Sequence, residues 1–265
     1  MEGGTEVNSH DKHVVIIGNG VTGVSAALRI RALQPTWKIT MISGESKFHF
    51  SRPALMYIFM GHMRYQDCKP YEDSFWDEKK IDLVRDWVLE IQPDKKNLKL
   101  HKGGALDYDK LLIATGSKSN KFGWPGQELD GVQGLWDLMD LRQMYKTAER
   151  TKQAVIVGGG LIGIELAEML HSRHIPVTFL VREKSYWDNI LSFEESQMVT
   201  REIQSEGFDL RLETEMAEVI DNGKGQVGAV TTKSGDRIDC EFVGLTAGVS
   251  PNADLARDSG IECGR

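Results

Sequence analysis

The most informative residues of this sequence are glycines, which recur in two similar stretches. The first stretch, GNGVTG, follows the apolar run VVII, and the second, GGGLIG, follows AVIV. A glycine turn between a strand and a helix presents backbone N–H groups and the positive end of the helix dipole, and both attract a diphosphate. The six positions are Gly18, Gly20, Gly23, Gly158, Gly160 and Gly163.

The spacing GxGxxG gives each glycine a separate task. The first allows a sharp turn, the second lets the backbone approach a pyrophosphate closely, and the third lets the helix pack tightly on the strand. One such pattern is weak evidence, because it is short and glycine is common. Two copies, each between an expected strand and an expected helix, predict two dinucleotide-binding sites.

The sequence predicts a strand–turn–helix–strand unit around each glycine stretch. In the first copy, β-branched residues run into Gly18, a helical pattern starts at Val21, and WKITMIS is the second strand. In the second copy, 155–157 and VTFLV are the expected strands and 164–172 is the expected helix. Gly158 lies 140 positions after Gly18 (158 − 18), too far for a solenoid repeat. We therefore expect an α/β fold with two Rossmann-like domains in series.

The remaining patterns set the expected domain boundaries. Residues 45–65 are expected to form a loop and a short helix, and the glycine-rich residues 122–134 a linker. The first domain is predicted over residues 1–120, the second over 121–246, and a return segment over 247–265. Further strands are expected at 81–91, 97–101, 106–117, near Asp209 and Gln226, and at 240–246, with helices at 137–151 and 194–206 and a hairpin at 233–236.

Charged residues after the second strand of each unit are candidates for ribose recognition. A carboxylate there binds ribose hydroxyls, whereas an arginine favours the 2′-phosphate of NADP. In the first copy the candidate is Glu45, which lies 27 positions after Gly18 (45 − 18). In the second copy Arg182 and Glu183 follow VTFLV, so the sequence leaves NADH and NADPH both open.

The composition excludes several classes of partner. The 265 residues are 40% hydrophobic and 27% charged, and the net charge of −7 disfavours binding to nucleic acid. No apolar run approaches the ~20 residues that span a bilayer. The first ten residues, MEGGTEVNSH, lack the basic start and apolar centre of a secretory signal. We expect a cytoplasmic protein without a nucleic-acid or membrane partner.

The sequence suggests neither a catalytic side chain nor a metal site. Cys68, Cys240 and Cys263 are too far apart for a CxxC redox pair or a clustered set of metal ligands. No placed histidine, Tyr-Lys pair or zinc ligands could handle a substrate proton, as a flavin-free dehydrogenase would require. Any redox chemistry would therefore come from a bound cofactor.

Five pieces of the sequence occur in the order found in one protein family. They are GNGVTG, YDKLLIATGS, WPGQELDGV, GGGLIGIELA and GVSPN. Together they resemble the flavoprotein pyridine-nucleotide oxidoreductases, which include rubredoxin reductases, ferredoxin reductases and the reductase part of NADH nitrite reductase. Because this chain lacks a redox cysteine pair, it is similar to the branch without redox-active cysteines.

The resemblance implies a function for both glycine turns. In the family, the first turn holds FAD and the second holds NADH or NADPH. The implied reaction is hydride transfer from nicotinamide to flavin, followed by electron transfer to a small redox protein or a fused redox centre. The flavin would carry the chemistry, so no catalytic side chain is expected.

The resemblance also implies further cofactor-binding residues. Arg52 and Pro53 match an arginine-proline pair beside the FAD diphosphate, and the backbone of Val88 matches a position facing the adenine. Glu165 matches a glutamate near the nicotinamide. The segments where the chain crosses between the domains beside the flavin are Ala114, Thr115 and Gly116 on the outward pass and Gly248 on the return.

Two departures from the family pattern carry consequences. Tyr57 stands where relatives with an RPPLSK-like segment place a lysine close to the flavin. The second FAD signature, which ends in AAGD, is absent, since the GD pair at Gly235 and Asp236 lies in a hairpin before GVSPN. We therefore expect an FAD domain that is discontinuous and truncated at its C-terminus. The rival hypothesis is a non-catalytic NAD(P)/FAD-binding module or fragment that acts as a sensor or interaction protein.

Overall fold

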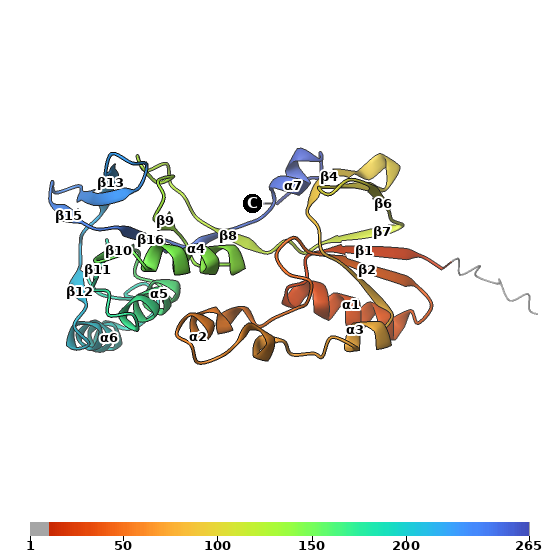
Figure 1. Ribbon diagram of the computed structural model, residues 1–265, viewed down its shortest axis with the longest axis horizontal. Coiled ribbons are helices and arrows are strands. Elements are labelled where there is room, and N and C mark those ends of the chain that lie inside the picture. The colour runs from red at the N-terminus through yellow and green to blue at the C-terminus, as the bar shows by residue number, and fades with distance from the viewer. Residues whose placement is uncertain (1–10, 265) are drawn as a thin grey trace, which may run out of the picture. The chain divides into compact units, whose positions relative to one another are not determined.

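The chain folds into two units, which Figure 1 shows as ribbons. The structure is a computed structural model that describes residues 11–264, so the predicted absence of a signal in MEGGTEVNSH concerns residues outside the described range. Unit 1 comprises Met1–Ser51, Gln66–Gly116 and Pro251–Arg265. Unit 2 comprises Arg52–Tyr65 and Ser117–Ser250.

Unit 1 is built on a four-stranded parallel sheet in the order β3-β2-β1-β7. The central strand β1 (His13–Ile17) pairs with β2 (Lys38–Ile42) on one side and β7 (Lys110–Ile113) on the other. The outer strand β3 (Ile81–Val84) extends the sheet beyond β2. Because all four strands run the same way, their carboxyl ends meet at one edge of the sheet.

The two faces of this sheet are covered by different elements. The side chains of Val14 and Ile16 pack with Val24 and Ala27 of helix α1 (Val21–Leu33). The alternate residues, Val15 and Ile17, pack on the other face with residues of an antiparallel meander. Figure 1 shows α1 and α3 (Phe75–Glu78) below the sheet and β4 (Val88–Gln92), β5 (Asn97–Leu100) and β6 (Ala105–Asp107) above it.

Unit 2 repeats this plan with one more strand. Its parallel sheet has the order β12-β11-β10-β16-β9, with β10 at the centre. Helices α5 and α6 follow β10 and β11 along the chain. The bounds are β9 (Val132–Gln133), β10 (Ala154–Val157), α5 (Leu161–His171), β11 (Val177–Leu180), α6 (Phe193–Ser205), β12 (Asp209–Arg211) and β16 (Phe242–Leu245).

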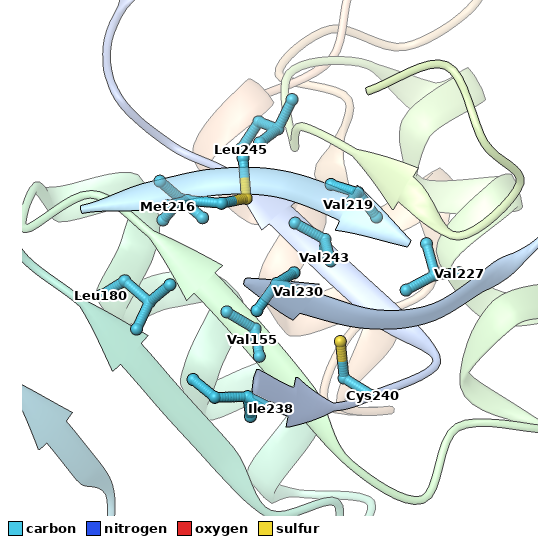
Figure 2. Packing of buried hydrophobic residues seen from close by; sticks show 11 residues of the cluster. Val155, Leu180, Met216, Val219, Val227, Val230, Ile238, Cys240, Val243 and Leu245 are labelled. Atoms are coloured by element: carbon cyan, nitrogen blue, oxygen red, sulfur yellow. The ribbon is translucent and has the colours of Figure 1, made fainter. Parts of the chain in front are cut away.

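A second meander covers the other face of the unit 2 sheet. Its strands are β13 (Met216–Asp221), β14 (Val227–Thr232) and β15 (Arg237–Asp239). Figure 2 shows side chains from these strands, such as Val230 and Ile238, facing Val155 and Val243 of the parallel sheet. Burial of such apolar side chains stabilises each layer by about 25 cal/mol per Å² of apolar surface removed from water.

From the central strand onward, the chain order is the same in both units. A glycine turn, a helix and a second strand follow β1 or β10, and a meander precedes the last strand of the parallel sheet, β7 or β16. In unit 2, β9 comes before the central strand. The remaining elements are the short strands β8 (Ser117–Ser119) and β17 (Val249–Pro251), which pair with each other, the helices α2 (Leu55–Phe59), α4 (Leu138–Ala148) and α7 (Asp254–Asp258), and the 3₁₀ turns η1 (Arg52–Ala54), η2 (Tyr65–Cys68) and η3 (Pro93–Lys95).

Three expected elements differ from those in the structure. The strand expected over 106–117 is divided, because Asp107 ends β6 in the meander and Lys110 begins β7 in the parallel sheet. The strand predicted at 81–91 is two strands, because the chain leaves the parallel sheet after β3 and enters the meander as β4. The buried carboxylate of Asp86 makes this bend by accepting hydrogen bonds from the backbone N–H groups of Trp87 and Lys102. The linker predicted at 122–134 contains β9, which forms an edge of the unit 2 sheet.

The segment Arg52–Tyr65, which the sequence assigns to the first domain, clusters with unit 2. Phe59 is buried, and its ring lies 4.9 Å from that of Tyr145 in α4. The Tyr145 hydroxyl donates a hydrogen bond to the carbonyl oxygen of Ile58 at 2.9 Å, and Arg173 donates one to that of Phe59 at 3.0 Å. These contacts join residues far apart in sequence, so no local sequence pattern predicts them.

Arg31 ties three segments of unit 1 together. Its guanidinium, at the last turn of α1, donates hydrogen bonds to five backbone carbonyl oxygens. These oxygens lie beyond the helix end, before β2 and before β3, on Gln34, Pro35, Trp37, Lys79 and Lys80. The planar fork of arginine suits such a set, because its N–H groups point in fixed directions.

We expect Arg31→Met to lower the free energy of unfolding by about 2 kcal/mol, since the hydrogen bonds from a charged donor to five carbonyl oxygens are lost. Urea denaturation followed by circular dichroism would measure this loss. The matched control is Arg29→Met, an exposed arginine on the same helix. Equal free energies of unfolding for the two variants would contradict the role of Arg31 in joining the three segments.

Candidate functional site

The first glycine turn is tightly packed at two of its three glycines. Gly18 has a φ of +110°, and a Cβ there would lie 2.1 Å from the carbonyl oxygen of Ala114. A Cβ at Gly23 would lie 2.0 Å from the carbonyl oxygen of Gly18. Gly20 differs, because its backbone is extended and no protein atom lies within 4 Å of an added Cβ. The space in front of Gly20 is therefore open to a ligand.

The second turn has the same arrangement. Gly158 has a φ of +121°, and its Cβ would lie 2.9 Å from the carbonyl carbon and oxygen of Thr246. A Cβ on Gly163 would come within 3.0 Å of the Gly158 carbonyl oxygen and the Thr246 hydroxyl. The nearest atom to a Cβ on Gly160 is 3.9 Å away. Both turns therefore combine two crowded glycines with an open one.

The helices that start at these turns carry no side-chain cap. Neither α1 nor α5 has a capping hydrogen bond from a side chain or an acidic residue in its first turn. Helices α4 and α6 of unit 2, in contrast, each begin with a complete capping box. The first N–H groups of a helix need an acceptor. At the two glycine turns, an anion in the open space would supply it.

Asn19 fixes the loop that carries Glu45. Its side chain is buried and donates a hydrogen bond to the carbonyl oxygen of Ser46 at 2.9 Å. The Nδ1 of His49 lies 2.8 Å from the carbonyl oxygen of Asn19. Glu45 itself is half-buried between the end of β2 and this anchor. The sequence pattern marks Glu45 but not Asn19, whose only signal is a polar residue between two glycines.

The predicted crossing segments lie close to the glycine turns of their own units. In unit 1, the N–H of Ala114 donates to the carbonyl oxygen of Ile17, and Thr115 exchanges side-chain hydrogen bonds with Asn252. Gly116 and Gly248 both have positive φ, +68° and +92°. In unit 2, the carbonyl oxygen of Gly248 accepts a hydrogen bond from the N–H of Asn120. Val88, the remaining backbone candidate, begins β4.

Arg182 and Glu183 form an ion pair with each other. The Nε of Arg182 donates to Glu183 Oε1 at 2.8 Å, and this hydrogen bond raises the pKa of Arg182. The Arg182 side chain is 76% exposed and that of Glu183 is 27% exposed. An exposed pair of this kind is held weakly. The guanidinium and the carboxylate can therefore each turn to a ligand at the end of β11.

Tyr186 supports the second glycine turn from below and was not predicted. Its ring is fully buried, and its hydroxyl donates a hydrogen bond to the carbonyl oxygen of Gly160 at 2.8 Å. Two residues of helix α6 hold Tyr186 in place. The backbone N–H of Tyr186 donates a hydrogen bond to the Thr200 hydroxyl, and the carbonyl oxygen of Tyr186 accepts one from the Ser196 hydroxyl. A tyrosine at this spacing gives no sequence signal, because its partner is 26 residues away.

Glu165 lies half-buried on α5, four residues after Leu161 at the helix start. Burial raises the pKa of its carboxyl group, and the nearby negative charge of Glu168 adds to this effect. The carboxylate form is therefore disfavoured in the folded protein. An acid with a raised pKa beside a glycine turn is typical of a functional site.

Arg52 and Pro53, predicted at the FAD diphosphate, lie in η1 of unit 2. The guanidinium of Arg52 donates to the carbonyl oxygen of Trp136 at 2.5 Å and lies 6.0 Å from the centre of the Trp136 ring. Contacts with FAD stay a prediction for both residues. Tyr57, on the next helix, is 46% exposed.

None of the three cysteines forms a disulfide bond within residues 11–264. Cys68 and Cys240 are buried, and burial raises the pKa of both, that of Cys240 to about 12. Within residues 11–264, no cluster of three or more histidine, cysteine or acidic side chains could hold a metal ion. The described helices include none with the length and apolar character needed to span a membrane.

A family model described as pyridine nucleotide-disulphide oxidoreductase matches residues 12–265. The chain belongs to this family. The match confirms the family predicted from the five sequence pieces, and with it the oxidoreductase class.

Curated relatives and solved structures agree with this assignment. Over 96% of its length the chain is 26% identical to a nitrite reductase [NAD(P)H] of Bacillus subtilis (strain 168), of which it covers 32%. It is 28% identical to the ferredoxin–NAD(+) reductase subunit of the benzene 1,2-dioxygenase system of Pseudomonas putida, of which it covers 62%. The chain thus spans between a third and two thirds of these relatives.

The fold is that of a solved ferredoxin reductase from Rhodopseudomonas palustris. The two structures align with a TM-score of 0.86 at 23% identity, over 96% of this chain and 63% of the other. This likeness confirms the predicted α/β class with two Rossmann-like domains. The binding roles of the individual residues stay predictions.

We expect Glu165→Gln to stabilise the protein more at about pH 7 than at about pH 4. Because the folded-state pKa is raised, the wild-type stability is complete below the unfolded pKa and is lost as the pH rises through the folded value. Glutamine stays neutral and escapes this loss. Thermal unfolding at several pH values would measure it, with the exposed Glu202→Gln as control. A stability difference between Glu165→Gln and wild type that does not change with pH would contradict the raised pKa of Glu165.

Proposed function

We propose that this chain is an FAD-dependent NAD(P)H oxidoreductase, or the corresponding part of one, that passes electrons to a redox protein or centre. The observation that carries the proposal is the repeated turn with two crowded glycines, one open glycine and an uncapped helix start. Two such turns in one chain suit a pair of dinucleotides. Membership of the pyridine nucleotide-disulphide oxidoreductase family supports the same conclusion.

The first turn fits FAD. The open backbone at Gly20 and the uncapped start of α1 would receive the diphosphate, and Glu45, on the loop anchored by Asn19, would accept hydrogen bonds from ribose hydroxyls. The backbone of Val88 would face the adenine. The further residues of this proposed site within unit 1 are Gly18, Gly23, Ala114, Thr115 and Gly116. Arg52, Pro53 and Gly248, which the family resemblance also assigns to cofactor binding, belong to unit 2 and stay predictions.

The second turn fits the nicotinamide nucleotide. Gly160 offers the open backbone, with Gly158 and Gly163 packed behind it and Tyr186 holding its carbonyl oxygen. Arg182 would attract the 2′-phosphate of NADPH, and Glu183 would accept hydrogen bonds from the ribose hydroxyls of NADH. Glu165 would lie near the nicotinamide ring.

The bound flavin would supply the redox chemistry, accepting hydride from the nicotinamide and giving up electrons afterwards. The residues of the chain bind and orient the two nucleotides. The thiols of Cys68 and Cys240 are poor nucleophiles, because burial keeps them protonated. The proposed reaction therefore uses neither of these thiols.

The proposed electron acceptor is a small iron–sulfur or rubredoxin-like protein, or a redox centre on the same polypeptide. The curated relatives support this class, since their names include a nitrite reductase and a ferredoxin–NAD(+) reductase subunit. Reduced nicotinamide nucleotides are intracellular, so the proposal places the protein in the cytoplasm.

The purified protein, supplied with FAD, should be yellow and should bleach when NADH or NADPH is added without oxygen. Absorbance titration measures both the flavin bound per chain and the preferred nucleotide. A folded protein that binds nicotinamide nucleotide but stays colourless would favour the binding module instead. One that binds neither nucleotide would overturn both hypotheses.

A further inference from the structure

Trp87 is a large aromatic side chain placed half in solvent. Its exposed fraction is 51%, although burying an indole is among the larger apolar gains a protein can make. It follows β3, at the carboxyl edge of the unit 1 sheet, where the glycine turn and the Glu45 loop also lie. In open α/β sheets, ligands bind at this edge.

The indole lies directly against Gly44. A Cβ on Gly44 would come within 2.1 Å of Cδ2 and 2.2 Å of Cε2 of Trp87, so the ring fills the space of a side chain there. Gly44 immediately precedes Glu45 in the chain. The ends of β2 and β3 are joined by a 2.9 Å hydrogen bond from the N–H of Ser43 to the carbonyl oxygen of Val84. Trp87 is thus next to the loop proposed to bind ribose.

The backbone of Trp87 is held from behind. The buried Asp86 carboxylate accepts a hydrogen bond from the N–H of Trp87 at 2.8 Å. The N–H of His101 donates one to the carbonyl oxygen of Trp87 at 2.9 Å. Asp86 also accepts the N–H of Lys102 at 3.2 Å. A buried carboxylate is costly unless its hydrogen bonds are complete. Here it fixes the position of a ring that is itself not buried.

We propose that the indole of Trp87 is the surface on which the adenine of FAD stacks. Adenine is bonded to the ribose that Glu45 is proposed to bind, so an aromatic ring beside Glu45 lies within reach of the base. A flat, half-exposed indole gives such a base an apolar partner at little loss of side-chain freedom. This inference rests on the proposed function and adds a specificity residue to its FAD site.

The first test is the affinity of the full chain, freed of flavin, for FAD. Trp87→Ala should weaken binding about tenfold, and Trp87→Phe should stay within about threefold of wild type, because a smaller ring still stacks. The control is Leu33→Ala, which removes a side chain of similar exposure, 58%, at the far end of α1. Calorimetric titration gives the dissociation constants, and circular dichroism verifies folding.

The second test moves the ring without changing it. Gly44→Ala places a methyl group in the indole, which must swing away, while the φ of Gly44 lies outside the left-handed range and is open to alanine. This variant should also weaken FAD about tenfold. In the Trp87→Ala background the same change should have no further effect, since there is no ring left to displace. Such non-additivity is the signature of a direct contact.

The results separate the inference from the proposed function. If wild type binds FAD and is bleached by NADH, but Trp87→Ala binds FAD as tightly, the inference is wrong and the function stands. Additive losses for Gly44→Ala and Trp87→Ala, or no rescue by Trp87→Phe, would also overturn it. A wild-type chain without affinity for FAD would remove the proposed function and the inference together.

Discussion

Backbone packed against backbone at the glycine turns is the feature on which the rest of the structure depends. A Cβ on Gly18 would lie 2.1 Å from the Ala114 carbonyl oxygen, and one on Gly23 would lie 2.0 Å from that of Gly18. At Gly158 and Gly163 the nearest carbonyl or hydroxyl oxygen would be 2.9 and 3.0 Å away. The close approach brings the helix directly over the strand that precedes it. The start of the helix then points past the carboxyl edge of the sheet.

Among the four described helices of eleven or more residues, α1, α4, α5 and α6, only the two that follow the glycine turns start without a side-chain cap. In unit 2, α4 and α6 satisfy their first N–H groups with their own Asp137 and Ser192, whereas α5 offers Gly160 at the equivalent position. A glycine cap costs a few tenths of a kcal/mol relative to serine or aspartate. We interpret this small loss of helix stability as the consequence of leaving the first N–H groups available to an external anion.

The sequence predicted those parts of the molecule that depend on local patterns. The runs VVII and AVIV and the glycine turns are in their expected places, and the helix after the first turn begins at Val21 as predicted. The helix after the second turn was predicted from residue 164 but begins at Leu161. The division of residues 81–91 into two strands was missed, because apolar alternation continues across the bend at Asp86. The short strand β9 was missed because its pairing with β16 bridges more than a hundred residues.

The residues of the candidate site likewise include some that the sequence predicts and some that it does not. Its glycines and Glu45 are visible as motifs, whereas Asn19, Trp87 and Tyr186 act through partners that only the fold brings near. Their residue types are common outside functional sites, so no pattern in one sequence marks them. The packing of Arg52–Tyr65 on unit 2 likewise depends on Tyr145 and Arg173, far along the chain.

Aspartate placed at each open glycine provides the sharpest measurement. Gly20 and Gly160 have extended backbones and room for a side chain, so Gly20→Asp and Gly160→Asp should fold with unchanged or slightly raised stability, since aspartate caps a helix. Each carboxylate would occupy the place of a diphosphate. Equilibrium titration should show that Gly20→Asp loses FAD and keeps the nicotinamide nucleotide, and that Gly160→Asp does the reverse. Wild-type affinity for both nucleotides in either variant would contradict the claim that each glycine turn binds the diphosphate of one nucleotide.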